Sequence, residues 1–381
     1  MSLAKNNLSE DMQPAFGRTK IPGIEWMRVL AITLVLVLHA KPISPCKNSS
    51  VPFLFFYPIA AFYDFVACLG VPLFFLISMF LLEKRLQQER DYLGARLKRL
   101  LVLFFFWTAI QFLIWGLTLV SGLEGSESLA GHSLLATVLV GGPSLPMVGD
   151  SVIYFISDLV LLTAFHFLVR GYLRTKKARI LAIVLCVVFF PLGPLCKSLL
   201  FSKEQYSPLA GFLGMEYYSP LNFLVFIPIA IWLNESYLGL SNARRVWRGG
   251  SRLQVLIGVY LLLLMGEIGV RLFTDMPFRV YARPSLPFGA WVLMEIALRI
   301  RSAPLWVIKA SSLTLGVFAI HKYWILVVKL FIPDLPIISA EMFQSCRIDA
   351  ADPIRLFLVA GLTYATAKVL ARLSVFRPFV S

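Results

Sequence analysis

The sequence predicts an all-α, polytopic membrane protein with about ten transmembrane helices and both termini in the cytoplasm. Three observations lead to this prediction. The chain of 381 residues is 58% hydrophobic and only 15% charged, whereas soluble domains have about half apolar residues. Its mean hydropathy is +0.77, and the apolar residues are gathered in runs long enough to cross a bilayer. The basic residues are concentrated in alternate loops between those runs.

Hydrophobic runs of sufficient length occur ten times along the chain. Two other apolar stretches, 53–63 and 133–140, are too short to span, and we interpret them as re-entrant or interfacial segments. The ten runs cover about 24–43, 65–82, 98–120, 151–169, 180–196, 219–238, 253–272, 284–300, 304–330 and 354–371.

The loop charges orient these runs in the membrane. With ten spans, the basic clusters fall on one side, which the positive-inside rule makes cytoplasmic. We therefore divide the chain into a cytoplasmic N-terminal tail (1–23), a transmembrane domain (24–371) and a cytoplasmic C-terminal tail (372–381). This topology accounts for the net charge of +15, so we expect no nucleic-acid partner. The four basic loops contain Lys84, Arg85, Arg90, Arg96, Lys98 and Arg99; Arg170, Arg174, Lys176, Lys177 and Arg179; Arg244, Arg245, Arg248 and Arg252; and Arg299 and Arg301.

The first run contains two ionisable residues, Arg28 and His39. At about 100° per residue, eleven steps along a helix end about 20° past three full turns, so the two side chains share one helix face roughly 16 Å apart along the axis. Ionisable groups within a membrane are costly and usually mark a functional path. The sequence therefore predicts a cation near the cytoplasmic side and an imidazole towards the outer side.

A second imidazole, His321, lies in the ninth run at a depth similar to that of His39. Imidazole titrates near neutrality and can accept a proton from a hydroxyl group, so both residues are candidates for general-base catalysis. The alternative for each is an interhelical hydrogen bond, which is common for histidines in membrane helices.

Two arginines, Arg96 and Arg99, begin the third run. Residues at i and i+3 lie on one helix face, and two guanidinium groups there can bind phosphate. The alternative is that they are simply the basic residues expected at the cytoplasmic end of a span.

These same residues resemble motifs of the membrane-bound acyltransferase 3 family. Four short patterns occur in the order and spacing of that family, within a similar ten-span frame. Three departures are present: Met79 replaces a glycine, no proline follows soon after Arg99, and Ser151-Val-Ile-Tyr-Phe155 replaces a His-Leu-Trp-Phe-like segment. The matching patterns are Arg28-x10-His39, Phe74-Phe-Leu-Ile-Ser78, Arg96-x-x-Arg99 and Phe318-Ala-Ile-His321.

The resemblance implies transfer of an acyl group from cytoplasmic acyl-CoA to a hydroxyl of an extracytoplasmic polysaccharide, oligosaccharide or glycolipid. Acetyl-CoA is the expected co-substrate, succinyl or another short acyl group the alternative, and a bacterial inner membrane the expected location. His39 would be the base, with His321 as a second polar group near the acceptor. Arg28 would orient the donor or stabilise negative charge. Arg96 and Arg99 would hold the phosphates of CoA, and Ser78 would line the donor tunnel.

Two other functions stay open from the sequence. A transporter or flippase of a glycan intermediate would also be polytopic, but such proteins usually contain structural repeats and broken spans in matching halves, and neither is visible here. A purely structural or partner-binding role would leave the intramembrane Arg28 unexplained. The sequence does not indicate the oligomeric state, and membrane lipids are the only other partners we expect.

The remaining polar residues of the runs have no catalytic assignment. Asp158 is a candidate for a cavity wall, and the i,i+4 pairs Glu267–Arg271 and Glu295–Arg299 can neutralise one another. The cysteines and histidines lack metal-ligand spacing, so we expect no metal. A disulfide between Cys46 and Cys346 is geometrically possible because both lie in loops predicted outside.

Overall fold

The structure is a computed structural model that describes residues 21–40, 62–89, 91–120, 153–200, 219–240, 249–273, 280–332 and 351–380. Within these ranges it is entirely helical, without any strand, which confirms the predicted all-α class. The α-helices are α1 (Pro22–Ala40), α3 (Gly70–Gln88), α4 (Tyr92–Val120), α6 (Ile153–Val169), α7 (Lys176–Leu200), α9 (Phe226–Leu240), α10 (Gly249–Phe273), α11 (Ser285–Ala297), α12 (Leu305–Ser311), α13 (Thr314–Phe331), α14 (Ala351–Arg372) and α15 (Arg377–Val380).

Each of the ten predicted hydrophobic runs coincides with at least one of these helices. Four stretches are long and apolar enough to cross a membrane, and α6 and α11 are shorter apolar helices. The protein is therefore an integral membrane protein, while the count of ten spans and the cytoplasmic position of both termini stay predictions. The four stretches are Pro22–Ala40, Ala67–Gln88, Ser251–Val270 and Pro353–Arg372.

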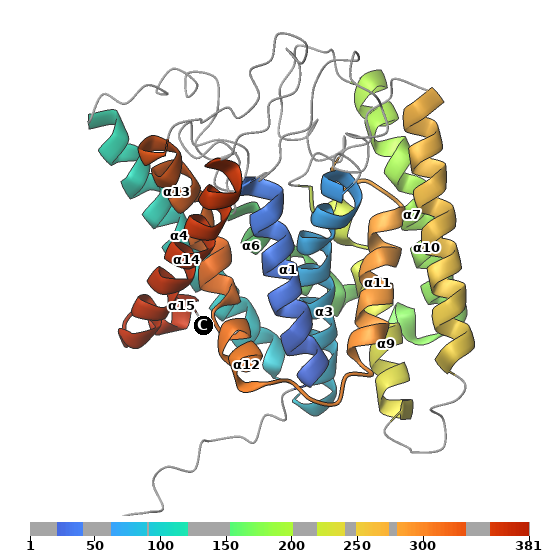
Figure 1. The fold of residues 1–381 in the computed structure, drawn as a ribbon. Helices are drawn as coiled ribbons and strands as arrows, with labels where there is room; N and C mark the ends of the chain where they lie inside the picture. Colours follow the sequence, from blue (N-terminus) through green and yellow to red (C-terminus); the bar gives the residue numbers. More distant parts are fainter. Residues whose placement is uncertain are drawn as a thin grey trace, which may run out of the picture.

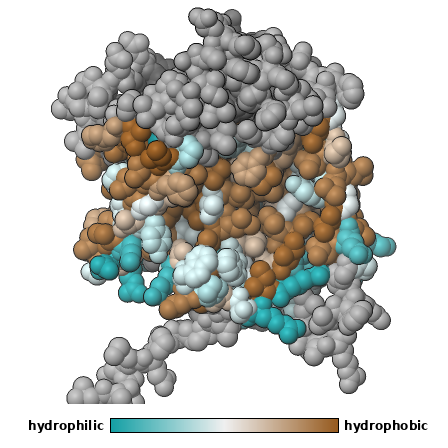
Figure 2. Space-filling model, viewed as in Figure 1, coloured by the Kyte–Doolittle hydropathy of each residue, from teal (hydrophilic) through white to brown (hydrophobic). Residues whose placement is uncertain are grey.

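The outer surface of the bundle is apolar, as contact with lipid requires. On the face drawn in Figure 2, hydrophobic residues cover the described helices, and hydrophilic residues gather at the lower edge. Helix α10 is typical of this surface, because Val255, Leu262 and Met265 are each more than half exposed. In water such a face would be unfavourable, so the surface agrees with a bilayer environment.

Helix α1 lies in the middle of the bundle (Figure 1) and packs against α3, α11, α12, α13 and α14. Helices α3 and α9 form a second line of contact, α4 packs against α6, and α10 covers α11 on the outside. The start of α1, the end of α3 and the start of α4 all lie at the lower end of the bundle in Figure 1. This arrangement places Arg28 and the two arginines of α4 at the same end.

The ninth predicted run differs from the expectation because it is broken into α12 and α13. Hydroxyl groups at the break donate to the backbone of their own turn: Ser312 Oγ lies 2.8 Å from the Lys309 carbonyl oxygen, and Thr314 Oγ1 lies 2.9 Å from that of Ser311. Such bonds compete with the regular helical pattern. The hydrophobic run is therefore continuous in sequence but not in backbone geometry.

Close helix packing around α1 depends on small residues, as is common in membranes. A Cβ atom at Gly23 would lie 1.7 Å from the carbonyl oxygen of Ala297, at the end of α11. A Cβ atom at Gly70 would lie 2.8 Å from the carbonyl oxygen of Ala31 in α1. Both contacts are with backbone atoms, which cannot rotate away, so these two glycines fix how closely α11 and α3 approach α1.

Gly23→Ala should therefore destabilise the protein by about 1–3 kcal/mol, the usual cost of overpacking a core. The measurement is thermal unfolding of the purified protein in detergent. Gly258→Ala on α10 is the matched control, because nothing lies within 4 Å of a Cβ atom there and alanine favours a helix by about 1 kcal/mol over glycine. An equal fall in unfolding temperature for both variants would contradict this account of Gly23.

Candidate functional site

Two imidazole rings meet inside the bundle. His39 lies near the end of α1 and His321 in the middle of α13, and their ring centroids are 5.2 Å apart with an angle of 34° between the planes. The two helices pack against each other, and α1 is continuous from Arg28 to His39. The structure thus brings together the two histidines for which the sequence indicated only a similar depth.

The hydrogen bond of His321 assigns its tautomer. Its Nδ1 atom lies 2.6 Å from the carbonyl oxygen of Phe318, and a carbonyl oxygen can only accept, so Nδ1 carries the hydrogen. Nε2 is buried and has no hydrogen-bond partner among the described residues. A second hydrogen there would make a buried cation with an unpaired N–H, which is costly, so the lone pair is on Nε2. The His321 side chain is 0% exposed. The site therefore contains a neutral imidazole with an open acceptor position, as a general base requires.

Aromatic rings join the helices below the histidine pair. Phe74 and Phe75 of α3 lie 6.1 and 4.7 Å from Phe155 of α6, measured between ring centroids. Phe318 of α13 lies 4.7 Å from Phe155 and 5.8 Å from the ring of His321. Such distances are typical of favourable aromatic pairs. The Phe-Phe pattern, the Phe155 segment and the Phe318–His321 pattern thus form one packed cluster.

Ser78 lies about one turn of α3 after this cluster, and its hydroxyl accepts a hydrogen bond from Arg96 of α4. The Nη2 atom of Arg96 donates to Ser78 Oγ at 2.7 Å, and its Nε atom donates to Thr163 Oγ1 at 3.2 Å. The guanidinium is therefore held between α3 and α6 in one orientation. The sequence linked neither Ser78 nor Thr163 to Arg96. It did not single out Thr163, which is one of four buried polar residues of α6.

Three arginines gather at this end of the bundle. Arg28 lies 4.0 Å from Glu25, and both Arg28 and Arg96 are close enough to Arg99 to be affected by its charge. Glu25 is itself buried and accepts a hydrogen bond from Ser311. Three guanidinium groups gathered at one end of the bundle suit a ligand with several negative groups.

Two other residues singled out from the sequence, Met79 and Asp158, are buried. Met79, which replaces a glycine, is fully buried in the core. Asp158 of α6 is 1% exposed, and its Oδ2 atom has no hydrogen-bond partner within the described part of the chain. Its place in a cavity wall stays a prediction.

Other predicted contacts have different outcomes. Cys46 and Cys346 lie outside the described residues, as does the side chain of Arg271. The predicted Glu267–Arg271 pair therefore stays a prediction. Glu267 accepts hydrogen bonds from the backbone N and the Oγ of Ser285, at 2.6 and 2.7 Å. Glu295 forms an ion pair with Arg252 of α10 at 2.7 Å, a partner that the sequence did not indicate.

Comparison with known proteins agrees with the motif pattern. The profile of a family described as an acyltransferase domain matches residues 21–372, nearly the whole chain. The same stretch contains all four patterns and every helix up to α14. A search of curated proteins finds no match.

His321→Leu should leave the unfolding temperature unchanged or higher. Leucine removes a buried nitrogen that has no partner within the described part of the chain, and the bond to the Phe318 carbonyl that it loses is within the same helix. Residues kept for activity often have this stability cost. Thermal unfolding in detergent measures the effect.

The matched control is Glu267→Leu, which leaves the two donors of Ser285 unpaired and should cost about 1–3 kcal/mol. If His321→Leu destabilises the protein as much as this control, then His321 has a structural role.

Proposed function

This chain belongs to the acyltransferase 3 family, and from that membership and the geometry of its site we propose that it transfers an acyl group from cytoplasmic acyl-CoA to a hydroxyl of an extracytoplasmic glycan. Acetyl is the proposed group, with succinyl or another short acyl group as the alternative. The acceptor is a polysaccharide, oligosaccharide or glycolipid, and the location is a bacterial inner membrane.

One observation carries this proposal, the separation of two kinds of polar group along α1. The arginines gather at the start of the helix and the imidazoles at its end, roughly 16 Å apart at 1.5 Å per residue. That is about half of a hydrocarbon core roughly 30 Å thick. A reaction whose donor is a polyanion and whose acceptor is a neutral hydroxyl needs these two environments.

The arginines suit the donor end. CoA has several phosphate groups, and guanidinium groups bind phosphate through paired hydrogen bonds. Arg96 and Arg99 are proposed to hold these phosphates, and Ser78 supports Arg96 through its 2.7 Å hydrogen bond. Arg28, which lies in α1, orients the donor or stabilises the negative charge that develops as the thioester is attacked.

The imidazoles suit the acceptor end. His39 is proposed to take the proton of the acceptor hydroxyl while the hydroxyl oxygen forms a bond to the thioester carbonyl carbon. The carbon–sulfur bond then breaks, and the CoA thiolate leaves and takes up the proton. His321 is 0% exposed, and its Nε2 atom has no hydrogen-bond partner among the described residues. We propose that this atom accepts a hydrogen bond from the ring of His39.

His39→Ala should lower acyl transfer by about 10²–10⁴-fold, the usual contribution of a positioned general base. The assay uses purified protein in vesicles with radiolabelled acetyl-CoA on one side and the host glycan on the other. Mass spectrometry of the glycan gives the acylated position. Full modification of the glycan by this variant, at normal membrane insertion, would rule out His39 as the base. Glycan movement without acylation in the wild type would favour a flippase instead.

Arg99→Ala should raise the apparent KM for acyl-CoA roughly tenfold or more, because a hydrogen bond to a charged group contributes about 1.5–3 kcal/mol, with little change in kcat at saturating donor. Lys98→Ala is the matched control, since Lys98 is the neighbouring exposed cation of α4 outside the Arg-x-x-Arg pattern. If both variants leave the donor dependence unchanged, Arg99 only contributes to topology.

A further inference from the structure

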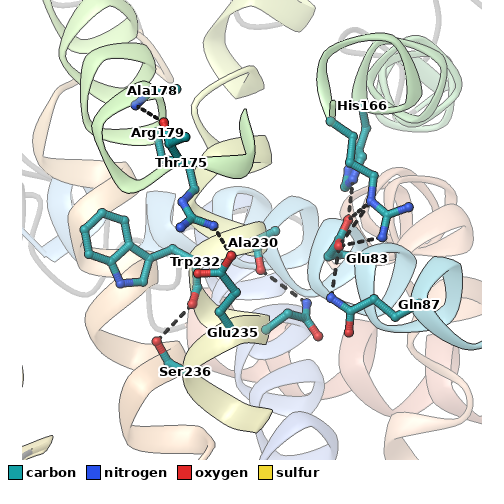
Figure 3. Close-up of polar contacts among 12 residues, drawn as sticks. Glu83, Gln87, His166, Thr175, Ala178, Arg179, Ala230, Trp232, Glu235 and Ser236 are labelled. Atoms are coloured by element: carbon teal, nitrogen blue, oxygen red, sulfur yellow. Dashed lines mark hydrogen bonds and ion pairs between the residues drawn. The ribbon is translucent and has the colours of Figure 1, made fainter. Parts of the chain in front are cut away.

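A buried carboxylate outside the proposed site connects the ends of α3 and α6. The side chain of Glu83 is 4% exposed and that of His166 is 0% exposed, and His166 Nε2 lies 2.8 Å from Glu83 Oε2. Arg170 donates through Nε and Nη2, the latter at 3.0 Å from Oε1, and Gln87 donates at 3.1 Å. Figure 3 shows Glu83 between His166 and Gln87.

Glu83 borders a cavity but is held by its hydrogen bonds. The cavity has a volume of about 430 Å³, and Phe167, Leu173 and Ile231 line it together with Arg170, Arg174 and Glu235. His166 and Arg170 are one turn apart, so their bonds to one carboxylate fix the end of α6 against α3.

The contacts of Glu83 with His166 and Arg170 form a polar joint between α3 and α6. A second polar joint between these helices, formed by Arg96, lies beside it. Arg96 bridges the same two helices through Ser78 of α3 and Thr163 of α6. Ser78 precedes Glu83 by five residues, and Thr163 precedes His166 by three, less than one turn. A shift of α6 relative to α3 would therefore separate Thr163 from Arg96.

We propose that Glu83, bound by His166 and Arg170, is a positioning residue that keeps Ser78 and Thr163 at the spacing that orients Arg96 for the phosphates of the donor. The role of Arg96 in donor binding rests on the proposed function. The effect of Glu83 on the orientation of Arg96 does not. Glu83 itself touches neither donor nor acceptor; it acts through α6.

A matched control exists on the other side of the bundle. Glu295 is also buried and is bound by an arginine of another helix, Arg252 of α10, at 2.7 Å. Helices α10 and α11 lie on the opposite side of α3 from α4 (Figure 1). Glu295→Gln removes the same charge from the same kind of joint, so it reports the general cost of losing a buried ion pair.

The first experiment needs no donor. Purified protein is treated with phenylglyoxal, which modifies accessible guanidinium groups, and the modification of Arg96 is followed by peptide mass spectrometry. Glu83→Gln should increase the rate at Arg96 at least about fivefold, the lower end of typical coupling between sites. Glu295→Gln should not. An unchanged rate at Arg96 in Glu83→Gln, or an equal increase in both variants, would overturn the proposal.

The second experiment measures acyl transfer with acyl-CoA. Glu83→Gln should raise the donor KM roughly tenfold with little change in kcat, and the increase should disappear in an Arg96→Lys background, because coupled residues are not additive. Equal, additive effects in both backgrounds would overturn the proposal. If the wild type has no acyl transfer, the proposed function fails, and the phenylglyoxal result alone decides the role of Glu83.

Discussion

The structure depends on how charged side chains are satisfied among apolar helices. A guanidinium or carboxylate within a membrane bundle is tolerated only when other groups of the protein replace its contacts with water. Several buried charges therefore join helices. Arg96 links α4 to α3 and α6, Glu83 links α3 to α6, and Glu295 links α11 to α10. Because packing between apolar helices differs little from packing against lipid, these polar joints set the relative positions of the helices that carry the site.

The joints are unequal in chemical character, and this difference separates scaffold from site. Around Glu83 the carboxylate is surrounded by donors that leave its charge matched. At one end of α1, Arg28 lies beside Glu25, with Arg96 and Arg99 near by, and at His321 a nitrogen has no partner among the described residues. Gathered guanidinium groups at one end of α1 and an open lone pair at the other suit the binding of ligands.

The sequence was sufficient for features set by local periodicity. The shared face of Arg28 and His39 follows from helix geometry, and the ten hydrophobic runs follow from composition, since each coincides with a described helix. Contacts between distant segments were not predictable. Thr163 lies 67 positions from Arg96, and His166 lies 83 from Glu83, so only the folded bundle selects these pairs. The break between α12 and α13 was missed because hydropathy does not register hydroxyl groups that bond to their own backbone.

The burial of His321 has a consequence for water. The proposed donor, acyl-CoA, is a thioester, and an enzyme that activated water as readily as the hydroxyl of the proposed acceptor would hydrolyse that donor. Here the open nitrogen of His321 is 0% exposed, and Phe74, Phe155 and Phe318 close the interior beside it. A large acceptor can form contacts of its own when it enters this interior, and these contacts offset the aromatic contacts that it displaces. A single water molecule cannot form such contacts. In the proposed reaction, selectivity for the acceptor hydroxyl over water would therefore depend on the aromatic packing rather than on the imidazoles.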